Sequence, residues 1–457
     1  MAPGYSDSSQ LLRATIFHTP RNPFQQVPAL EAFYDGGLLI ENGRIVACGD
    51  YAAVRDACPR ARTRDLRGGF VLPGFIDTHV HYPQIRILGA LGYSLLDWLE
   101  KRTLPEEARF ASPDYAQAVA SEFVTALLAH GTTSALVFGS HFAPATGLLF
   151  EAARKAGLRI ASGLVLSDRR LRPELHVDAE TAYSESRELI RRFHGHGRAL
   201  YAVSPRFALS TSEAMLEVCQ TLLTENPGVL LQTHLNENAR EIEEIGRLFP
   251  WARDYLAVYE RFHLIGGRTV LAHSVHSSPS AVERLAASGT WVAHCPSSNA
   301  ALGSGIFPMR RHVEAGVRFA LGTDVAGGTG FGMPKEALQA YLCQRLLGSD
   351  GWNLTPAHLL YLATRAGTEA LGLEAEIGDF QPGKSADFVH LKPPEGSPLA
   401  SVAAHAESAE RLLASIITLA GAETVQETWV AGSTVFRKPA AERVRRGGTQ
   451  RDTGEAV

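Results

Sequence analysis

The chain has 457 residues, of which 45% are hydrophobic and 20% charged, a composition typical of a folded protein long enough for a barrel and a second domain. Its formal net charge of -4 gives no electrostatic case for binding nucleic acid or a membrane surface. No charged stretch with an apolar core opens the chain and no apolar run could cross a bilayer, so we expect neither signal peptide nor membrane span. The five cysteines lack paired spacing, which favours a reducing, cytoplasmic compartment over a disulfide framework.

The two ends of the chain have the pattern of a small β domain. Residues 11–20 and 36–49 have the pattern of short strands and turns, and Asn42-Gly43 is a typical hairpin turn. Strand-like segments return past Gly378, at 378–391 and 423–438. We therefore expect residues 1–72 and 378–457 to combine into one small β domain, which flanks a central domain of residues 73–377.

The central part alternates between strand and helix patterns. Eight short apolar segments recur, at residues 71–77, 132–138, 159–166, 200–205, 229–234, 269–273, 290–294 and 317–324. Helix-like segments lie between them, such as 114–131, 145–157 and 181–193, with Gly131 and Gly157 where helix C-terminal caps are expected. This alternation predicts an α/β fold of the (β/α)8 TIM-barrel type, whose chemistry lies at the C-terminal ends of the strands.

Polar residues that can bind a metal follow several of these apolar segments. His79 and His81 end the first one, and because residues i and i+2 of a strand point to the same side, both rings can bind one ion. His234, His273 and Asp324 end three later segments. Imidazole and carboxylate are usual zinc ligands, and three histidines with one aspartate leave a position for water.

Histidines at strand ends also have structural roles, and a metal site can hold one ion or two. A single histidine at a strand end is more often structural, and the chain has 17 histidines, so the argument depends on the whole set. His141, His276 and His294 also end apolar runs and are expected to be structural or to support the ligands. A binuclear site often needs a lysine at a further strand end. Between Arg102 and Lys384 the only lysines are Lys155 and Lys335, both in helix-like segments, which predicts a single ion.

Six segments together resemble the amidohydrolase superfamily and, within it, the guanine deaminase family. They are PGFIDTHVHYPQ, SLLDWLEKRTLPEEARF, AVSPRFALS, QTHLNENAREI, VAHCPSSNAALGSG and LGTDVAGG. The resemblance covers most of residues 71–330 and extends to the flanking β segments. An HxH pair alone would indicate only the superfamily, whereas HYPQ, SPRF and HLNEN in this order are more specific.

The resemblance implies a role for each site residue. One zinc ion per chain would be held by His79, His81, His234 and Asp324. Glu237 would shuttle the proton, with Asp324 as a second acceptor, and His273 would orient the attacking water without being a principal ligand. The purine would be bound by Gln84, Arg206, Phe207 and Glu237.

The chemistry of these side chains is consistent with such roles. Zinc lowers the pKa of a coordinated water to about 7, and a nearby carboxylic acid can pass its proton to the departing amine. Arg206 has a planar fork of donors that suits a carbonyl beside a ring nitrogen, and Gln84 can both donate and accept. Structural alternatives stay open: Glu237 as a helix N-terminal acid, Arg206 as a surface arginine or an inter-strand ion pair, Phe207 as a core aromatic. Trp98 is expected to be a packing residue, with a loop over the site as the alternative.

These expectations amount to a zinc-dependent hydrolase that converts guanine to xanthine and ammonia, in purine catabolism. The alternatives are a deaminase of a related heterocycle, such as 8-oxoguanine, a pterin or a triazine, or a non-catalytic barrel scaffold. The zinc signature of the base-flipping deaminases, with its P-C-x-x-C motif, is absent, and no basic stripe is present, so a free base is expected rather than a polynucleotide. The resemblance also implies a possible homodimer.

Overall fold

The protein is described by a computed structural model that covers residues 9–439. Residues 1–8 and 440–457 lie outside the described part, so the expectations about the extreme ends of the chain are not addressed by it. Within residues 9–439, no helix is both long and apolar enough to cross a membrane.

The centre of the molecule is a parallel barrel, which confirms the predicted fold class. Its strands pair in chain order, each with the next: β5 (Phe75–His81), β6 (Thr132–Phe138), β7 (Arg159–Gly163), β9 (Ala199–Pro205), β10 (Leu230–Leu235), β11 (Thr269–His273), β12 (Trp291–His294) and β13 (Arg318–Leu321). A short strand, β8 (Val165–Leu166), extends the pairing along β9. Hydrogen bonds join the last strand region to the first, because the Asp324 amide donates to the His79 carbonyl (2.7 Å) and the His81 amide to the Val325 carbonyl (3.0 Å).

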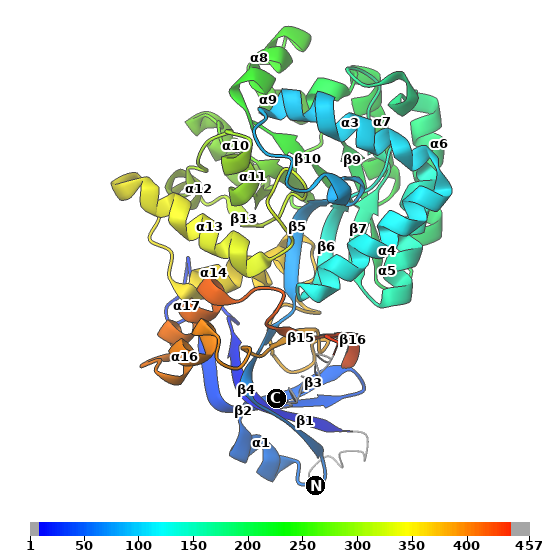
Figure 1. The fold of residues 1–457 in the computed structure, drawn as a ribbon. Helices are drawn as coiled ribbons and strands as arrows, with labels where there is room; N and C mark the ends of the chain where they lie inside the picture. Colours follow the sequence, from blue (N-terminus) through cyan, green and yellow to red (C-terminus); the bar gives the residue numbers. More distant parts are fainter. Residues whose placement is uncertain (1–8, 440–457) are drawn as a thin grey trace, which may run out of the picture.

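Helices surround this barrel (Figure 1). They include α4 (Pro113–Ala129), α5 (Ala143–Ala156), α6 (Ala179–Phe193), α7 (Glu213–Glu225), α8 (Ala239–Leu248), α9 (Tyr255–Arg261), α10 (Pro279–Ser288), α11 (Pro296–Ala301), α12 (Met309–Ala315), α13 (Met333–Leu346), α14 (Pro356–Ala363) and α15 (Arg365–Ala370). Gly157 ends α5 in the left-handed conformation, at φ 76°, and Gly131 follows α4 at φ 83°, as their predicted capping positions require. Inside the barrel, the side chains of Ile76, Leu136 and Trp291 form part of a buried apolar cluster, so the barrel is filled rather than open.

A second sheet combines strands from both ends of the chain. Its order is β16 (Ser433–Arg437), β15 (Val425–Val430), β14 (Phe388–Leu391), β4 (Arg62–Pro73), β1 (Gln10–His18), β2 (Glu31–Glu41) and β3 (Arg44–Asp50). All neighbours are antiparallel except β1 and β4, which are parallel. Asn42 and Gly43 form the turn between β2 and β3, with φ of 50° and 76°. The expected sheet from N- and C-terminal segments is therefore present, with the short helix α1 (Tyr51–Ala57) beside it.

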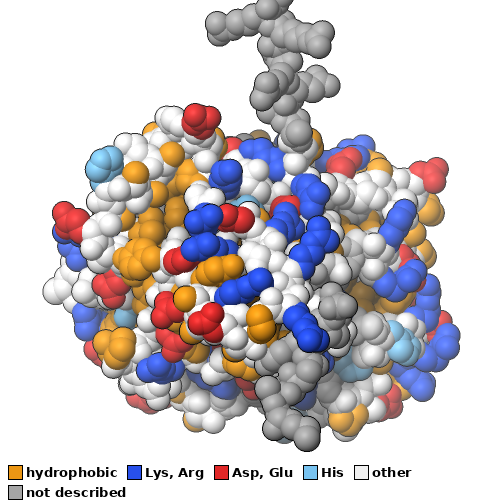
Figure 2. Space-filling view, turned by 90° about the horizontal axis from the view of Figure 1, so that it is seen from below, with side chains coloured by type: hydrophobic (Ala, Val, Ile, Leu, Met, Phe, Trp, Pro, Cys, Tyr) orange, Lys and Arg blue, Asp and Glu red, His pale blue; other side chains and the backbone are white. Residues whose placement is uncertain are grey.

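This sheet lies below the barrel in the view of Figure 1, and Figure 2 looks at the molecule from that end. Basic and acidic side chains are intermingled on that face, in keeping with the small net charge of the chain.

Two helices within the C-terminal segment had no counterpart in the sequence analysis. They are α16 (Pro398–Ala404) and α17 (Ala409–Leu419), and α17 packs against α13 and α14 of the barrel. Part of the C-terminal segment thus contacts the central domain rather than the small sheet. The division into residues 1–72 with 378–457 and residues 73–377 remains a proposal.

Candidate metal centre and substrate pocket

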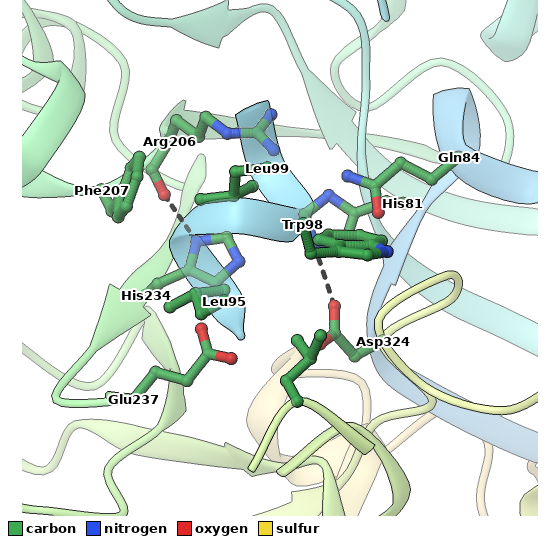
Figure 3. A pocket seen from close by; sticks show the side chains of 11 residues that line it. His81, Gln84, Leu95, Trp98, Leu99, Arg206, Phe207, His234, Glu237 and Asp324 are labelled. Carbon is green, nitrogen blue, oxygen red and sulfur yellow. Dashed lines mark hydrogen bonds and ion pairs between the residues drawn. The ribbon is translucent and has the colours of Figure 1, made fainter. Parts of the chain in front are cut away.

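Four side chains meet at the C-terminal mouth of the barrel. His79 and His81 end β5, His234 lies near the end of β10, and Asp324 follows β13. One ligand atom from each lies within 4.8 Å of those of the other three, and all four are shielded from solvent. The Oδ1 atom of Asp324 is 3.2 Å from Nε2 of His81 (Figure 3). The same oxygen is 3.3 Å from Nε2 of His79. The barrel therefore brings the four predicted ligands together as a possible metal-binding group.

Protonation and hydrogen bonding suit this group to a divalent cation. Burial lowers the pKa of His79 to about 4 and that of His234 well below its ordinary value, so both rings are neutral at pH 7. The Nδ1 atom of His234 donates to the Arg206 carbonyl at 2.5 Å, which leaves Nε2 with its lone pair directed into the site. Burial alone would raise the pKa of Asp324, but His79 and His81 hold it well below its ordinary value. Neutral imidazoles and an ionised carboxylate are the forms that bind metal.

Glu237 and His273 lie beside the four ligands. The Nδ1 atom of His273 is bound to Oδ1 of Asn299 at 2.9 Å, and its Nε2 atom lies 3.3 Å from Glu237 Oε2 and 3.9 Å from Asp324 Oδ2. Burial raises the pKa of Glu237 well above its ordinary value, and the charge of Asp324 adds to this effect. A carboxyl group that can carry a proton at neutral pH thus adjoins the possible metal site.

The backbone turns sharply where these side chains leave the strands. Asn236, His273, Ser274 and Asp324 have φ of 49°, 76°, 53° and 49°, in the left-handed region that residues with a Cβ atom rarely adopt. Such conformations cost about 1–3 kcal/mol each and occur mostly at functional sites. Here they lie at the ends of β10, β11 and β13, and two of the four, His273 and Asp324, were predicted to be functional.

A pocket of about 340 Å³ opens beside the four ligands. Its lining residues are His81, Gln84, Leu95, Trp98, Leu99, Arg206, Phe207, His234, Glu237, Leu302 and Asp324. Both polar and apolar side chains line it, and Leu95, Trp98 and Leu99 are among the apolar ones (Figure 3).

The residues predicted to bind substrate all line this pocket. Gln84 lies in the turn Tyr82–Ile87 after β5, and Arg206 and Phe207 directly follow β9. The Phe207 ring lies 6.1 Å from that of His234, between centroids. Arg206 is only 3% exposed, so its alternative as a surface arginine does not hold.

The apolar wall of the pocket comes from the segment around Trp98, for which packing was expected and a loop over the site was the alternative. The short helix α2 (Leu95–Trp98) and the turn after it, Leu99–Thr103, contribute Leu95, Trp98 and Leu99 to the pocket. Trp98 is 4% exposed and packs in the buried apolar core, as expected, and it also lines the pocket.

One buried polar residue of the site was missed. Glu107, in α3 (Leu104–Ala108), accepts hydrogen bonds from Gln84, Arg206 and His141. The matched segment SLLDWLEKRTLPEEARF contains it, but nothing in its local pattern separates Glu107 from the adjacent Glu106. Of the other histidines, His141 supports Glu107, whereas His276 binds the Ser304 carbonyl at 2.7 Å. His294 is buried without a hydrogen-bond partner among residues 9–439.

The lysines of the central segment lie away from the site. Lys155 belongs to α5 and Lys335 to α13, so neither stands at a strand end. A lysine that bridges two metal ions has no candidate at the described strand ends, as the sequence analysis expected.

Comparison with known proteins agrees with this geometry. A sequence profile described as the amidohydrolase family matches residues 70–435. A probable guanine deaminase from Deinococcus radiodurans is 56% identical over 436 residues, which cover 94% of this chain and 99% of that protein. The solved structure of Escherichia coli guanine deaminase superposes with a TM-score of 0.89 at 36% identity, covering 95% of this chain and 100% of the other. Guanine deaminase from Bradyrhizobium japonicum gives 0.90 at 34% identity, covering 94% and 100%. With more than half of its length matched by the profile, this chain belongs to the amidohydrolase family.

Proposed function

We propose that this protein is a zinc-dependent guanine deaminase, which hydrolyses guanine to xanthine and ammonia. The observation that carries the proposal is the group His79, His81, His234 and Asp324, which adjoins a pocket lined by Glu237 and Arg206. Relatives named guanine deaminase, one of them 56% identical over nearly the whole chain, support the same substrate.

The donor set fits a zinc ion, which His79, His81, His234 and Asp324 would hold. When bound, zinc would supply the Lewis acidity that makes a water molecule a usable nucleophile at neutral pH. We propose one ion per chain, since the only lysines between Arg102 and Lys384 are on helices α5 and α13.

Glu237 would move the proton in this reaction. Its carboxylate accepts a proton from the attacking water and returns it to a ring nitrogen or to the departing amine, and Asp324 can serve as a second acceptor. The C2–N bond then breaks and ammonia leaves, so that one water and one guanine yield one xanthine and one ammonia. His273, held by Asn299 through Nδ1, would direct Nε2 toward the reacting water and orient it.

The purine would lie between polar and apolar walls of the pocket. Arg206 and Gln84 can pair with an edge that presents a carbonyl next to an N–H group. Phe207 and Trp98 offer apolar faces for the ring system, and both are nearly fully buried.

The test is ammonia release from guanine by the zinc-loaded protein, compared with adenine, 8-oxoguanine, a pterin and a triazine. Guanine should give the highest kcat/KM. A clear preference for one of the other heterocycles would support the hydrolase activity but replace guanine as the proposed substrate. No ammonia release from any of them would favour the non-catalytic scaffold.

The cellular setting is proposed on separate grounds. The five cysteines are all free, four of them buried, which suits a cytoplasmic, reducing environment. We also propose that the partners are a purine and water, without nucleic acid or membrane. The homodimer that the family resemblance implies stays a prediction, for which size-exclusion chromatography with light scattering is the measurement.

A further inference from the structure

A buried carboxylate lies behind the substrate-facing side of the pocket. Glu107 is 3% exposed and belongs to the helix α3, whereas the other polar residues of the site lie at or near the ends of barrel strands. Three donor groups converge on its two oxygens: Gln84 Nε2 at 3.0 Å, Arg206 Nη1 at 2.8 Å from each oxygen, and His141 Nε2 at 3.0 Å. Glu107 therefore contacts both side chains that would read the purine without lining the pocket itself.

This arrangement determines which way the Gln84 amide is turned. A carboxylate can only accept hydrogen bonds, so the amide group that faces Glu107 must be the NH2 group. The other end of the amide, Oε1, accepts from the backbone N–H of Ala326 at 3.2 Å. With both ends held, Gln84 keeps one N–H and one oxygen lone pair for a ligand, in a single orientation.

The same carboxylate compensates the charge of Arg206. The side chains of the pair are 4% and 3% exposed, so water screens their charges little. Burial by itself would raise the pKa of Glu107, but the charge of Arg206 and the hydrogen bond from His141 hold it well below its ordinary value. Only Nη1 of Arg206 is used, and within residues 9–439 its Nε and Nη2 donors make no other hydrogen bond. The guanidinium can thus donate to a ligand while its positive charge is already paired.

We propose that Glu107 is a positioning residue that sets substrate charge: through Gln84 and Arg206 it makes this end of the pocket select an uncharged purine edge, with a carbonyl next to an N–H group, over an anionic purine. This deepens the proposed function and rests on it. An unpaired buried arginine would favour an anion, as arginines that bind carboxylates and phosphates do. Paired with Glu107, Arg206 offers directed donors without net charge, which matches a neutral lactam.

Glu107→Gln is the direct test, because it removes the charge with little change in shape. An amide offers one acceptor oxygen to three converging donors, so its own NH2 group must face at least one of them, which misplaces Gln84 or Arg206. The matched control is Glu106→Gln. Glu106 is the neighbouring residue, also buried, but it is bound to Tyr115 and Arg109 and does not line the pocket.

The measurement is calorimetric binding of two unreactive purines to the zinc-loaded full chain: neutral hypoxanthine and the urate anion. The parent should prefer hypoxanthine. In Glu107→Gln the ratio of the two dissociation constants should shift toward urate by about 10²-fold, the scale of a charged hydrogen-bonded contact. Glu106→Gln should keep the parent ratio. Equal losses for both ligands, or an unchanged ratio, would overturn the proposal.

Arg206→Met is a second variant, for which the ratio of the two dissociation constants should shift in the opposite direction. It tests the proposal even if Glu107→Gln does not fold. It leaves the Glu107 carboxylate without its cation, so urate should be rejected more strongly than by the parent. A ratio that moves toward urate would overturn the proposal. These binding experiments do not need turnover. Guanine deamination without the ratio shifts would reject only the role of Glu107, whereas the shifts without deamination would reject only the proposed function.

Discussion

Glu237 and His273 face each other across two neighbouring strand ends, with Oε2 of Glu237 3.3 Å from Nε2 of His273. β10 and β11 are paired in parallel, so the turns after them emerge side by side at the mouth of the barrel. Asn299 holds the far nitrogen of His273, which directs the near one toward the carboxyl group. Because burial raises the pKa of Glu237, this pair can keep a proton close to the reacting centre at neutral pH.

Removal of a ligand should remove metal and activity together. We expect His79→Ala and His234→Ala to lose zinc and ammonia release, and the parent to contain one zinc per chain, as measured by elemental analysis of the purified protein. His405→Ala, at an exposed position in the turn after α16, is the control and should retain both. Two ions per chain, or an active protein without metal, would contradict the single-zinc proposal.

Glu237→Gln separates proton transfer from metal binding. The amide preserves size and hydrogen bonding but cannot carry the proton, so we expect zinc content to be unchanged and kcat to fall by about 10²–10⁴, the usual range for a general acid–base group. Steady-state ammonia release is the measurement. Glu243→Gln, on the exposed face of α8, should resemble the parent. Near-parental turnover by Glu237→Gln would reduce this residue to an acid near a helix N-terminus.

Arg206 should matter for the choice between purines. Guanine has a carbonyl at C6 where adenine has an amino group. With adenine, the Arg206 guanidinium would therefore face another donor instead of an acceptor. Buried polar groups left unpaired in this way can discriminate between ligands by about 10⁴ or more. We expect strong preference for guanine, and a much larger loss of kcat/KM in Arg206→Ala than in Arg311→Ala, an exposed control on α12. Comparable turnover of adenine, or equal behaviour of the two variants, would remove the purine-reading role while leaving the hydrolase.

Trp98 should contribute to substrate binding as part of the apolar wall of the pocket. Trp98→Ala opens the apolar side of the pocket to water, so we expect KM for guanine to rise by about tenfold or more, the scale for loss of a large buried contact, with zinc content unchanged. Trp251→Ala is the matched control, since Trp251 is 40% exposed and does not line the pocket. A KM equal to that of the control would make Trp98 a packing residue only.

The buried carboxyl of Glu336 should make stability depend on pH. Burial raises its pKa from the ordinary 4.5 to about 8, although Ser297 donates to it through both Oγ and N. Between pH 4.5 and pH 8 the folded protein holds a proton that the unfolded chain has released. The protonated carboxyl group therefore contributes its full share to the free energy of unfolding below about pH 4.5, and this share is lost as the pH rises toward 8. Denaturant unfolding should show that the free energy of unfolding falls less between pH 5 and pH 8 in Glu336→Gln than in the parent, by on the order of a few kcal/mol. Parallel behaviour of parent and variant would contradict the shift.

Local pattern in the sequence predicted five polar residues at the barrel mouth, and the family resemblance selected four of them as metal ligands. Each strand of a parallel barrel is mostly apolar, and the polar residues at its C-terminal end lie at the same mouth as those of the other strands. His79, His81, His234 and Asp324 follow this rule, and the alternation of strand and helix predicted the barrel that brings them together. The small sheet was predicted on the same basis, from strand patterns at the two ends of the chain.

Other features depend on contacts between distant segments, which no local period encodes. Glu107 is 99 residues from Arg206 in the chain, and the two meet only because α3 is folded across the barrel mouth. Trp98 has the same apolar character as any core residue, and its place in the pocket wall follows from where that segment lies. α17 has a buried face that could pack on either domain, and contact with α13 and α14 decided it. The sequence thus determined the strands and the polar residues at their ends, whereas tertiary packing decided which other side chains line the pocket and which groups pair with them.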